Sequence, residues 1–309
     1  MIYKNTLELI GHTPLVCLNH IQRTSGKLFA KLEAVNPGGS VKDRPALKII
    51  QQAYKENKLT PGQTVVEMTS GNMGAGLAVV CNATGNPFIA VMSAGNSPAR
   101  AKMLRDLGAE VILTPQIDGK PGQVTGNDIA AAVETAKEIA AEKKAFYVDQ
   151  FNNIASVLAH VENTGPEIWH DLNGQVDAFV AAVGSGGTFI GCSRYLKSKN
   201  PAIYCVAVEP IGAEVLAGKM ITNPKHVMQG TGYGIVPPHW EPALADSMMA
   251  VSDEEAIYYK ELLATKESLY VGYSAGANVC AAIKLLESGL LKNPTASVVT
   301  ILCDHGLKY

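Results

Sequence analysis

Short, nearly continuous apolar runs alternate with helical stretches along most of this 309-residue chain. The runs are rich in β-branched residues, as strands buried on both faces of a sheet are. The helical stretches place apolar residues on one face and charged residues on the other. This alternation predicts an α/β fold in which helices cover both faces of a parallel sheet. The expected strands are residues 27–33, 63–69, 87–92, 110–114, 145–148, 178–183, 204–209 and 297–303, and the expected helices are residues 99–107, 128–143, 254–263 and 277–286.

The chain is long enough for one large domain or two modest ones. Because the strand–helix pattern restarts near residue 145, we expect an N-terminal domain of residues 1–145 and a C-terminal domain of residues 146–309. Residues 116–127 form the loosest stretch and are expected to be a surface loop. Apolar residues make up 47% of the chain and charged residues 17%, which is typical of a soluble globular protein with a sizeable core.

Charge and targeting signals argue against several classes of protein. The net charge is −2 and no basic tract is present, so nucleic acid is not expected as a partner. Neither a signal peptide nor a membrane-spanning run of about 20 apolar residues is visible. The six cysteines form no CxxC pair and the seven histidines form no HxH or HExxH pattern. We therefore expect reduced thiols, a cytoplasmic location and no metal site.

A loop with the sequence NPGGSVKDR, residues 36–44, precedes a helical stretch and places Lys42 near the start of that helix. The backbone N–H groups and the dipole at a helix start favour anions and make an ammonium group less favourable. Lys42 would therefore lose its proton more easily, as a lysine that forms an imine must. Taken alone, the pattern also fits a solvated helix lysine, with Asp43 and Arg44 as a surface pair.

A second loop between a strand and a helix has donors that suit a carboxylate. It has the sequence EMTSGNMGAG, residues 67–76. Hydroxyl, amide and backbone N–H groups gather there at a helix start. An ordinary helix cap would have a similar composition. The donors are Thr69, Ser70, Gly71 and Asn72.

A third loop of this kind is rich in glycine and has the sequence VGSGGTFIG, residues 183–191. Its glycines let the backbone approach a phosphate closely, and its hydroxyls add donors. Phe189 breaks the GxGxxG spacing, and the lysine of a P-loop is absent, so a single phosphate fits better than a nucleotide. The residues offered to the phosphate are Gly184, Ser185, Gly186, Gly187 and Thr188.

Ser274 lies at a fourth strand–helix junction, GYSAGAN, residues 272–278. The first five residues match GxSxG, the nucleophile turn of α/β-hydrolases. A hydrolase would need a later histidine as base. His305 is the only histidine that follows, and it has no obvious acidic partner. The hydrolase interpretation is therefore disfavoured.

Taken in order, these motifs resemble the cysteine synthase and cystathionine β-synthase family of fold-type-II pyridoxal-phosphate (PLP) enzymes. The resemblance covers nearly the whole chain, through IGHTPLV, NPGGSVKDR, TSGN, TGPEIW, GSGGT, VAVEP, GTGYGIVP and GYSAGA. It implies a two-domain α/β fold of the tryptophan synthase β type, with mostly parallel twisted sheets flanked by helices. It also implies pyridoxal 5'-phosphate in a cleft between the domains, and an N-terminal segment, residues 1–35, packed on the C-terminal domain.

The resemblance also implies roles for individual residues. Lys42 would hold the cofactor as an imine and move the α-proton of the substrate. Asn72 would hydrogen-bond the 3′-oxygen of the cofactor, residues 184–188 would hold its phosphate, and Ser274 would meet its pyridine nitrogen. Substrate binding would fall to Thr69, Ser70, Gly71, Met73, Gln150, Gly230, Thr231 and Tyr233.

The implied reaction is β-replacement on a serine-derived amino acid, through an aminoacrylate intermediate, with a thiol or sulfide as nucleophile. A neutral serine at the pyridine nitrogen favours loss of a β-substituent over transamination or racemisation. The leading interpretation is cysteine synthase, which converts O-acetylserine and sulfide to cysteine and acetate. Open alternatives are cystathionine β-synthase-like, cysteine desulfhydrase or lanthionine-type β-replacement, a same-fold α,β-eliminating deaminase, a non-catalytic scaffold and a nucleotide-binding protein. A homodimer is expected from the resemblance alone.

A few positions depart from the pattern of the family. Met73 stands in place of the second threonine of TSGNTG, which removes a hydroxyl donor, and Met68 replaces the preceding proline. Asn96 replaces a methionine near the substrate. Tyr233 in GTGYG is more similar to cystathionine synthases, and no arginine in residues 225–235 could pair with a phosphoserine. The first substrate therefore stays open among O-acetylserine, serine, O-phosphoserine and cysteine.

Overall fold

The structure is a computed structural model that describes residues 2–22, 24–120 and 124–309. The chain forms two compact units. Unit 1 contains the chain up to Ile10 and Asn36–Ser156, and unit 2 contains Gly11–Val35 and Val157–Tyr309. The segment Gly11–Val35 therefore joins the later part of the chain, although it precedes most of unit 1 in sequence.

Unit 1 is built on a four-stranded sheet with the order β5-β4-β3-β6. All of its strand pairs are parallel. In the register of the sheet, Val65 lies opposite Phe88 on one side and Phe146 on the other. The elements of unit 1 are η1 (Thr6–Leu9), α1 (Asp43–Lys55), β3 (Val65–Met68), α2 (Asn72–Thr84), β4 (Phe88–Ser93), α3 (Pro98–Asp106), β5 (Glu110–Thr114), α4 (Gly126–Glu142) and β6 (Phe146–Tyr147).

The strands of unit 1 bury both of their faces, because side chains alternate along a strand. Val65 belongs to a hydrophobic cluster that includes residues of α1, α2 and α3. Its neighbour Val66 belongs to a second cluster, with Ala132 and Ala136 of α4. The apolar runs that predicted buried strands are therefore continuous because helices cover both faces of this sheet.

Unit 2 is built on a six-stranded sheet with the order β1-β2-β10-β7-β8-β9. Its strand pairs are parallel except for β1 and β2, which are antiparallel. The elements that lie wholly in unit 2 are β1 (Leu15–Cys17), β2 (Lys27–Leu32), η2 (Glu33–Val35), the π-helical turn η3 (His160–Thr164), α6 (Gly165–Asp171), β7 (Ala178–Ala182), α7 (Gly187–Lys199), β8 (Tyr204–Pro210), η4 (Pro242–Leu244), β9 (Ser247–Val251), α8 (Asp253–Lys266), α9 (Tyr273–Glu287), β10 (Ser297–Leu302) and η5 (Gly306–Lys308). The short helix α5 (Ala155–Ala159) leads from unit 1 into unit 2.

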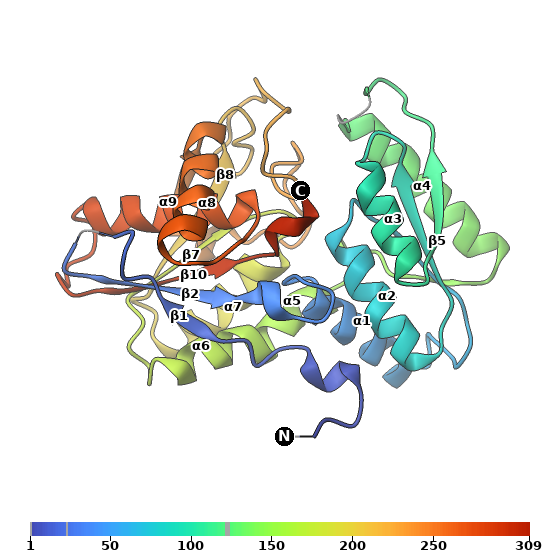
Figure 1. The fold of residues 1–309 in the computed structure, drawn as a ribbon, viewed down its shortest axis with the longest axis horizontal. Helices are drawn as coiled ribbons and strands as arrows, with labels where there is room; N and C mark the ends of the chain where they lie inside the picture. The colour runs from blue at the N-terminus through green and yellow to red at the C-terminus, as the bar shows by residue number, and fades with distance from the viewer. Residues whose placement is uncertain (1, 23, 121–123) are drawn as a thin grey trace. The chain divides into compact units, whose positions relative to one another are not determined.

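Helices cover both faces of the unit 2 sheet as well (Figure 1). Val180 of β7 packs in a cluster with residues of α8 and α9. Its neighbour Phe179 points to the other face, where its ring stacks on Phe189 of α7 with 6.3 Å between the ring centroids. Both units therefore confirm the expected α/β class with mostly parallel sheets flanked by helices.

Each expected strand and helix has a counterpart, and several further elements were not expected. The strands β1 and β9 both lie at edges of the larger sheet. The π-helical turn η3 precedes α6 and had no signal in the sequence. The surface loop expected at residues 116–127 ends two residues earlier than expected. Helix α4 begins at Gly126, where Thr125 and Asp128 form a capping box. Residues 121–123 of that loop lie outside the described residues.

The chain leaves unit 1 after Ser156, beyond the expected border at residue 145. β6 pairs with β3, so the residues around it belong to the smaller sheet. We propose that the two units are the two domains of the protein. In the part of the chain that the structure describes, none of the helices has the length and hydropathy needed to cross a membrane.

Candidate active site

Lys42 is the N-cap residue of α1 and is half-buried. Its backbone N–H donates to the hydroxyl of Ser40 at 3.3 Å. The carboxylate of Asp43 accepts a hydrogen bond from the backbone N–H of Gly38, which closes the loop ahead of the lysine. Asp43 and Arg44 are both buried, so the interpretation of these two residues as a surface pair is wrong. The loop fixes the backbone of Lys42 at a helix start, as the sequence predicted.

The loop after β3 is organised around the hydroxyl of Thr69. This oxygen accepts hydrogen bonds from the backbone N–H groups of Gly71 at 3.1 Å and Gly74 at 2.9 Å. A hydroxyl has two lone pairs and one hydrogen, so Thr69 still has its hydrogen to donate. Gly71, the N-cap residue of α2, has φ 146°, a conformation that side chains rarely adopt. The loop can therefore present Thr69, Ser70 and backbone donors to an anion.

Close packing of α1 on α2 brings Lys42 and this loop into one part of unit 1. A side-chain carbon at Gly76 would lie 3.0 Å from the carbonyl oxygen of Lys42, so a larger residue there would push the two helices slightly apart. Asn72, the first residue of α2, is half-buried. Met73 is buried in the hydrophobic cluster shared with α1 and α3. The thioether that replaces the family's hydroxyl therefore packs among apolar side chains.

Gln150 follows β6 and reaches the end of β3. Its amide nitrogen lies 3.5 Å from the carbonyl oxygen of Met68. The buried carboxyl of Glu67 accepts a hydrogen bond of 2.9 Å from the backbone N–H of Asp149. Burial raises the pKa of Glu67 to about 8. Glu67 was not among the predicted site residues, although an acid inside an apolar strand run was a visible signal.

Arg100 of α3 also contacts the loop and was not predicted. Its guanidinium donates to the carbonyl oxygen of Ser70 at 2.9 Å. Its side chain lies close to Gly71, where an added side-chain carbon would lie 3.3 Å from Cδ of the arginine. The arginine adds positive charge beside the donors of Thr69 and Ser70, which favours a bound carboxylate.

The glycine turn of unit 2 lies between the end of β7 and the start of α7. Gly186 is the N-cap residue of α7 with φ 89°, a left-handed conformation that favours glycine. A side-chain carbon at Gly184 would overlap the carbonyl oxygen of Gly230. The turn at residues 184–188 and the segment at Gly230 are therefore in direct contact. Ser185 is buried and Thr188 is half-buried.

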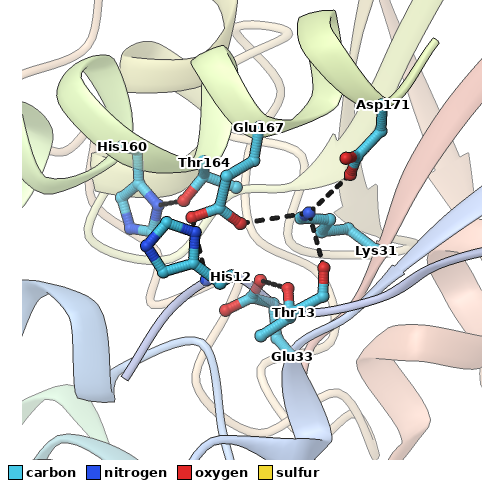
Figure 2. A network of polar contacts seen from close by, with 8 residues as sticks. All are labelled: His12, Thr13, Lys31, Glu33, His160, Thr164, Glu167 and Asp171. Atoms are coloured by element: carbon cyan, nitrogen blue, oxygen red, sulfur yellow. Dashed lines mark hydrogen bonds and ion pairs between the residues drawn. The ribbon is translucent and has the colours of Figure 1, made fainter. Parts of the chain in front are cut away.

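A buried histidine supports the hydroxyl of Thr188. The Nε2 atom of His160 lies 3.3 Å from Oγ1 of Thr188, and its Nδ1 atom lies 2.9 Å from Oγ1 of Thr164. A hydroxyl can donate or accept, so a neutral imidazole satisfies both contacts. Figure 2 shows the contact between His160 and Thr164 beside a second group of contacts around Lys31. His160 was not predicted, because its place on the π-helical turn η3 was not visible in the sequence.

Ser274, the second residue of α9, is buried. The start of α9 is fixed to the strand that leads into the glycine turn. Asn278 accepts a hydrogen bond of 2.7 Å from the backbone N–H of Ala182 and donates one of 2.8 Å to the carbonyl of Ile301. Thr231 follows Gly230, the residue that contacts the glycine turn. Its hydroxyl donates a hydrogen bond of 2.7 Å to the carbonyl oxygen of Met228.

These features fit a phosphate at the glycine turn. The N-cap residue of α7, Gly186, provides no side-chain cap, whereas α4 and α8 begin with capping boxes. A helix start without such a cap can direct its N–H groups at an anion. At Gly184 and Gly186, a side chain would overlap a neighbour or strain the backbone. Among residues 2–22, 24–120 and 124–309, no group of three or more His, Cys, Asp or Glu side chains could hold a metal ion.

Comparison with known proteins identifies the family. The model of the family described as "Pyridoxal-phosphate dependent enzyme" matches residues 6–304. The chain belongs to the pyridoxal-phosphate dependent enzymes. It is similar to cysteine synthase A of Escherichia coli K12, with 40% identity over all of this chain and 94% of the relative.

Two solved structures are also similar over the full chain. One is a hydrogen sulfide-producing enzyme from Fusobacterium nucleatum, with a TM-score of 0.91, 34% identity and full coverage of both chains. The other is the O-acetylserine dependent cystathionine β-synthase from Helicobacter pylori, with a TM-score of 0.90, 35% identity, and coverage of 100% of this chain and 97% of that one. These matches confirm the resemblance inferred from the motifs, and the family confirms PLP as the cofactor.

Each unit carries one group of the site residues predicted for this PLP-dependent enzyme. Unit 1 carries Lys42, Thr69, Ser70, Gly71, Asn72, Met73 and Gln150. Unit 2 carries residues 184–188, Gly230, Thr231, Tyr233 and Ser274. The roles of these residues stay predictions.

Proposed function

We propose that this PLP-dependent enzyme is a cysteine synthase that converts O-acetylserine and sulfide to cysteine and acetate. The observation that carries the proposal is the full-length similarity to cysteine synthase A at 40% identity. In this proposal Lys42 would supply the amine that the reaction needs, and the turn at residues 184–188 would supply the phosphate site. The first substrate would be bound as an α-amino acid, with its β-substituent as the leaving group.

Four parts of the chain would hold the cofactor. They are Lys42 at the aldehyde, Asn72 at the 3′-oxygen, residues 184–188 at the phosphate and Ser274 at the pyridine nitrogen. When bound, PLP supplies the electron sink that makes bonds at the substrate's α-carbon labile. The turn fits its phosphate because glycine at 184 and 186 lets the backbone approach closely.

The residues of unit 1 would orient the amino acid. Thr69 keeps its hydroxyl hydrogen for the substrate carboxylate, because both of its lone pairs accept backbone hydrogen bonds. Ser70 and the amide of Gln150 would add donors, and Arg100 would add positive charge. A carboxylate held in this way fixes the direction of the α-hydrogen, so that Lys42 can remove it as a general base.

A second candidate function is release of sulfide from cysteine. It is favoured by the Fusobacterium nucleatum enzyme, described as hydrogen sulfide-producing, which this chain matches with full coverage of both chains. Both functions would use the same groups on the chain and differ in the β-substituent that leaves. The choice between them therefore depends on which amino acid the enzyme accepts first.

A spectral titration of the purified holoenzyme tests the proposal. We expect O-acetylserine to shift the visible absorbance of the bound cofactor, and sulfide to restore it as cysteine forms. Serine, O-phosphoserine and cysteine are added in parallel. A response to cysteine with release of sulfide, and none to O-acetylserine, would replace the first proposal by the second. The variant Lys42→Ala is the control, because it should lack the visible band of the lysine-bound cofactor.

We also propose a homodimer in the cytoplasm as the working form. The support is the family resemblance, together with six cysteines and no CxxC pair, which suit a reducing compartment. Sedimentation of the holoenzyme at several concentrations tests the dimer, and a monomer at every concentration would contradict it.

A further inference from the structure

We propose that Glu67 is a positioning residue, which holds Gln150 where its side-chain amide can bind the carboxylate of the amino-acid substrate. The inference rests on the proposed function, because that function gives Gln150 its substrate. It assigns a task to a buried acid that the reaction itself does not use.

Glu67 is an acid inside the strand β3, and its side chain is 1% exposed. The neighbours Val66 and Met68 pack with α4 on one face of the sheet. Because side chains alternate along a strand, Glu67 points to the other face, as Val65 does. A buried carboxyl group is unfavourable unless hydrogen bonds compensate it, so a specific contact is expected to explain this residue.

That contact is with the turn that carries Gln150. The carboxyl oxygen Oε2 of Glu67 accepts a hydrogen bond of 2.9 Å from the backbone N–H of Asp149. Hydrogen bonds from the backbone and the side chain of Gln150 also favour the ionised form of Glu67. Asp149 has φ 53°, which is uncommon for a residue other than glycine and persists only where the surroundings stabilise it. The carboxyl of Glu67 supplies such a stabilising contact.

The position of this turn matters because it lies beside the loop that follows β3. The amide nitrogen of Gln150 is 3.5 Å from the carbonyl oxygen of Met68, the residue before Thr69. Two residues of β3 therefore contact the turn, Glu67 through its side chain and Met68 through its backbone. The two amide hydrogens of Gln150 are directed at Glu67 and at Met68, and the contact with Met68, at 3.5 Å, is long enough for the carboxylate of the substrate to replace it. Loss of the Glu67 contact would release the turn and remove Gln150 from the carboxylate of the substrate.

The neutral form of Glu67 is sufficient for this task. Burial raises its pKa to about 8, with a smaller contribution from the carboxylate of Asp149. Tyr147 of β6, which is itself partly buried, also interacts with the charge of Glu67. A neutral carboxyl still accepts the hydrogen bond from Asp149. Glutamine has the same shape and a carbonyl acceptor, so Glu67→Gln should keep the turn in place.

A double-mutant cycle on the holoenzyme tests the coupling. The variants are Glu67→Ala, Gln150→Ala, their combination, and Glu67→Gln. The measurements are the Kd for O-acetylserine from the visible spectrum, and KM and kcat. We expect Glu67→Ala and Gln150→Ala each to raise Kd and KM about ten-fold, the value of one lost hydrogen bond. The double variant should be no weaker than Gln150→Ala, and Glu67→Gln should stay within about three-fold of wild type.

Hydrogen exchange of the holoenzyme without substrate gives a second readout that does not depend on activity. Glu67→Ala should speed the exchange of the Asp149 amide, whereas Gln150→Ala and Glu67→Gln should not. If Glu67→Ala does not fold, Glu67→Asp serves instead, because its carboxyl is one methylene too short to reach. The matched control is Asp128→Ala, which removes another buried carboxylate that accepts two backbone N–H groups. Asp128→Ala should lower the stability of the protein and leave the Kd for O-acetylserine unchanged.

Two outcomes would overturn the inference. One is additive effects of Glu67→Ala and Gln150→Ala on Kd, and the other is unchanged exchange of the Asp149 amide in Glu67→Ala. A wild-type enzyme whose spectrum does not respond to O-acetylserine would instead count against the proposed function. In that case, the exchange measurement would still decide whether Glu67 holds the turn.

Discussion

Gly184 has no room for a side chain, since its first carbon would overlap the backbone carbonyl oxygen of Gly230. The oxygen belongs to the backbone, so the variant Gly184→Ala must push the two segments apart. We expect a loss of about 1–3 kcal/mol of stability, as for other overpacked sites. We also expect weaker PLP binding, by roughly ten-fold or more, because the displaced turn is the proposed phosphate site. The measurements are the Tm and the Kd for PLP added to the apoenzyme.

Gly126→Ala is the matched control for this prediction. Gly126 is the first residue of α4, and nothing lies within 4 Å of an added side-chain carbon. The substitution should leave the Kd for PLP unchanged and the Tm equal or slightly higher, because alanine favours a helix more than glycine does. Equal PLP affinities of Gly184→Ala and wild type would contradict the proposed phosphate site.

The buried carboxyl of Glu67 should make stability depend on pH. Burial raises its pKa to about 8 in the folded protein, whereas an unfolded glutamate titrates near 4.3. Between these two values the folded state binds the proton and the unfolded state does not, so the free energy of unfolding falls as the pH rises. The stabilisation that the protonated Glu67 provides is fully present below about pH 4. It is lost as the pH rises to about 8. The total loss is roughly 3–5 kcal/mol.

Urea unfolding of wild type and Glu67→Gln between pH 5 and pH 9 measures this dependence. Glutamine does not titrate, so the variant should gain stability relative to wild type as the pH rises. Glu142→Gln, at an exposed position in α4, is the control and should follow the wild-type curve. A constant difference between Glu67→Gln and wild type over this range would show that Glu67 titrates normally.

The sequence suggested candidate site residues where local patterns carry chemistry, and it could not reveal contacts between residues far apart in the chain. Lys42 and residues 184–188 were visible because a loop and the following helix are adjacent in the chain. Glu67 contacts Asp149 across 82 positions, and His160 contacts Thr188 across 28. No spacing rule relates such pairs, since they meet only when strands pair and helices pack. The packing of Met73 into the core was hidden for the same reason.

At the scale of elements, Lys31 ties β2 to α6. Its ammonium group lies 3.0 Å from the carboxylate of Glu167 and 2.9 Å from that of Asp171, and it donates to the carbonyl oxygen of Thr13 at 2.7 Å. Figure 2 shows these contacts meeting at one point. The lysine side chain is 1% exposed, so water cannot replace its partners. The segment that contains β1 and β2 is thereby fixed to unit 2.

Lys31→Met removes the cation that both carboxylates contact. We expect a loss of about 3–5 kcal/mol of stability, as for other buried ion pairs that lose one partner, measured by urea unfolding. The control is Lys58→Met, whose ion pair with Glu56 is exposed at 66% and 37%. Exposed pairs contribute little, so the control should match wild type. Equal effects of the two variants would contradict the assigned role of Lys31.

Long apolar runs predicted the central strands, and the edges of the sheets were harder to predict. The strands β3, β4, β7 and β10 are covered on both faces, which produces the continuous apolar pattern that predicted them. β9 is an edge strand whose residues are mostly half-buried, and β1 has three residues, so neither has a strong pattern. The end of unit 1 was hard to predict for the same reason, because the strand there is short. β6 has only two residues, yet its pairing with β3 keeps the chain in unit 1 beyond residue 145.

At the scale of the whole molecule, each unit carries only part of the proposed cofactor site. Lys42 and Asn72 belong to unit 1, whereas residues 184–188 and Ser274 belong to unit 2. A ligand that binds the native state and not the unfolded state stabilises the native state by mass action. The stability of the protein should therefore depend on the concentration of PLP.

Removal of PLP should lower the Tm, and its return should restore the Tm. At a hundred times its Kd, PLP should stabilise the protein by about 2.7 kcal/mol, which corresponds to several degrees. Pyridoxal, which has the aldehyde but no phosphate, is the matched ligand and should stabilise less, because it leaves residues 184–188 unused. In Gly184→Ala the two ligands should become more nearly equal, since the phosphate contacts are weakened there. Equal shifts by PLP and pyridoxal in the wild-type apoenzyme would mean that the turn does not bind the phosphate.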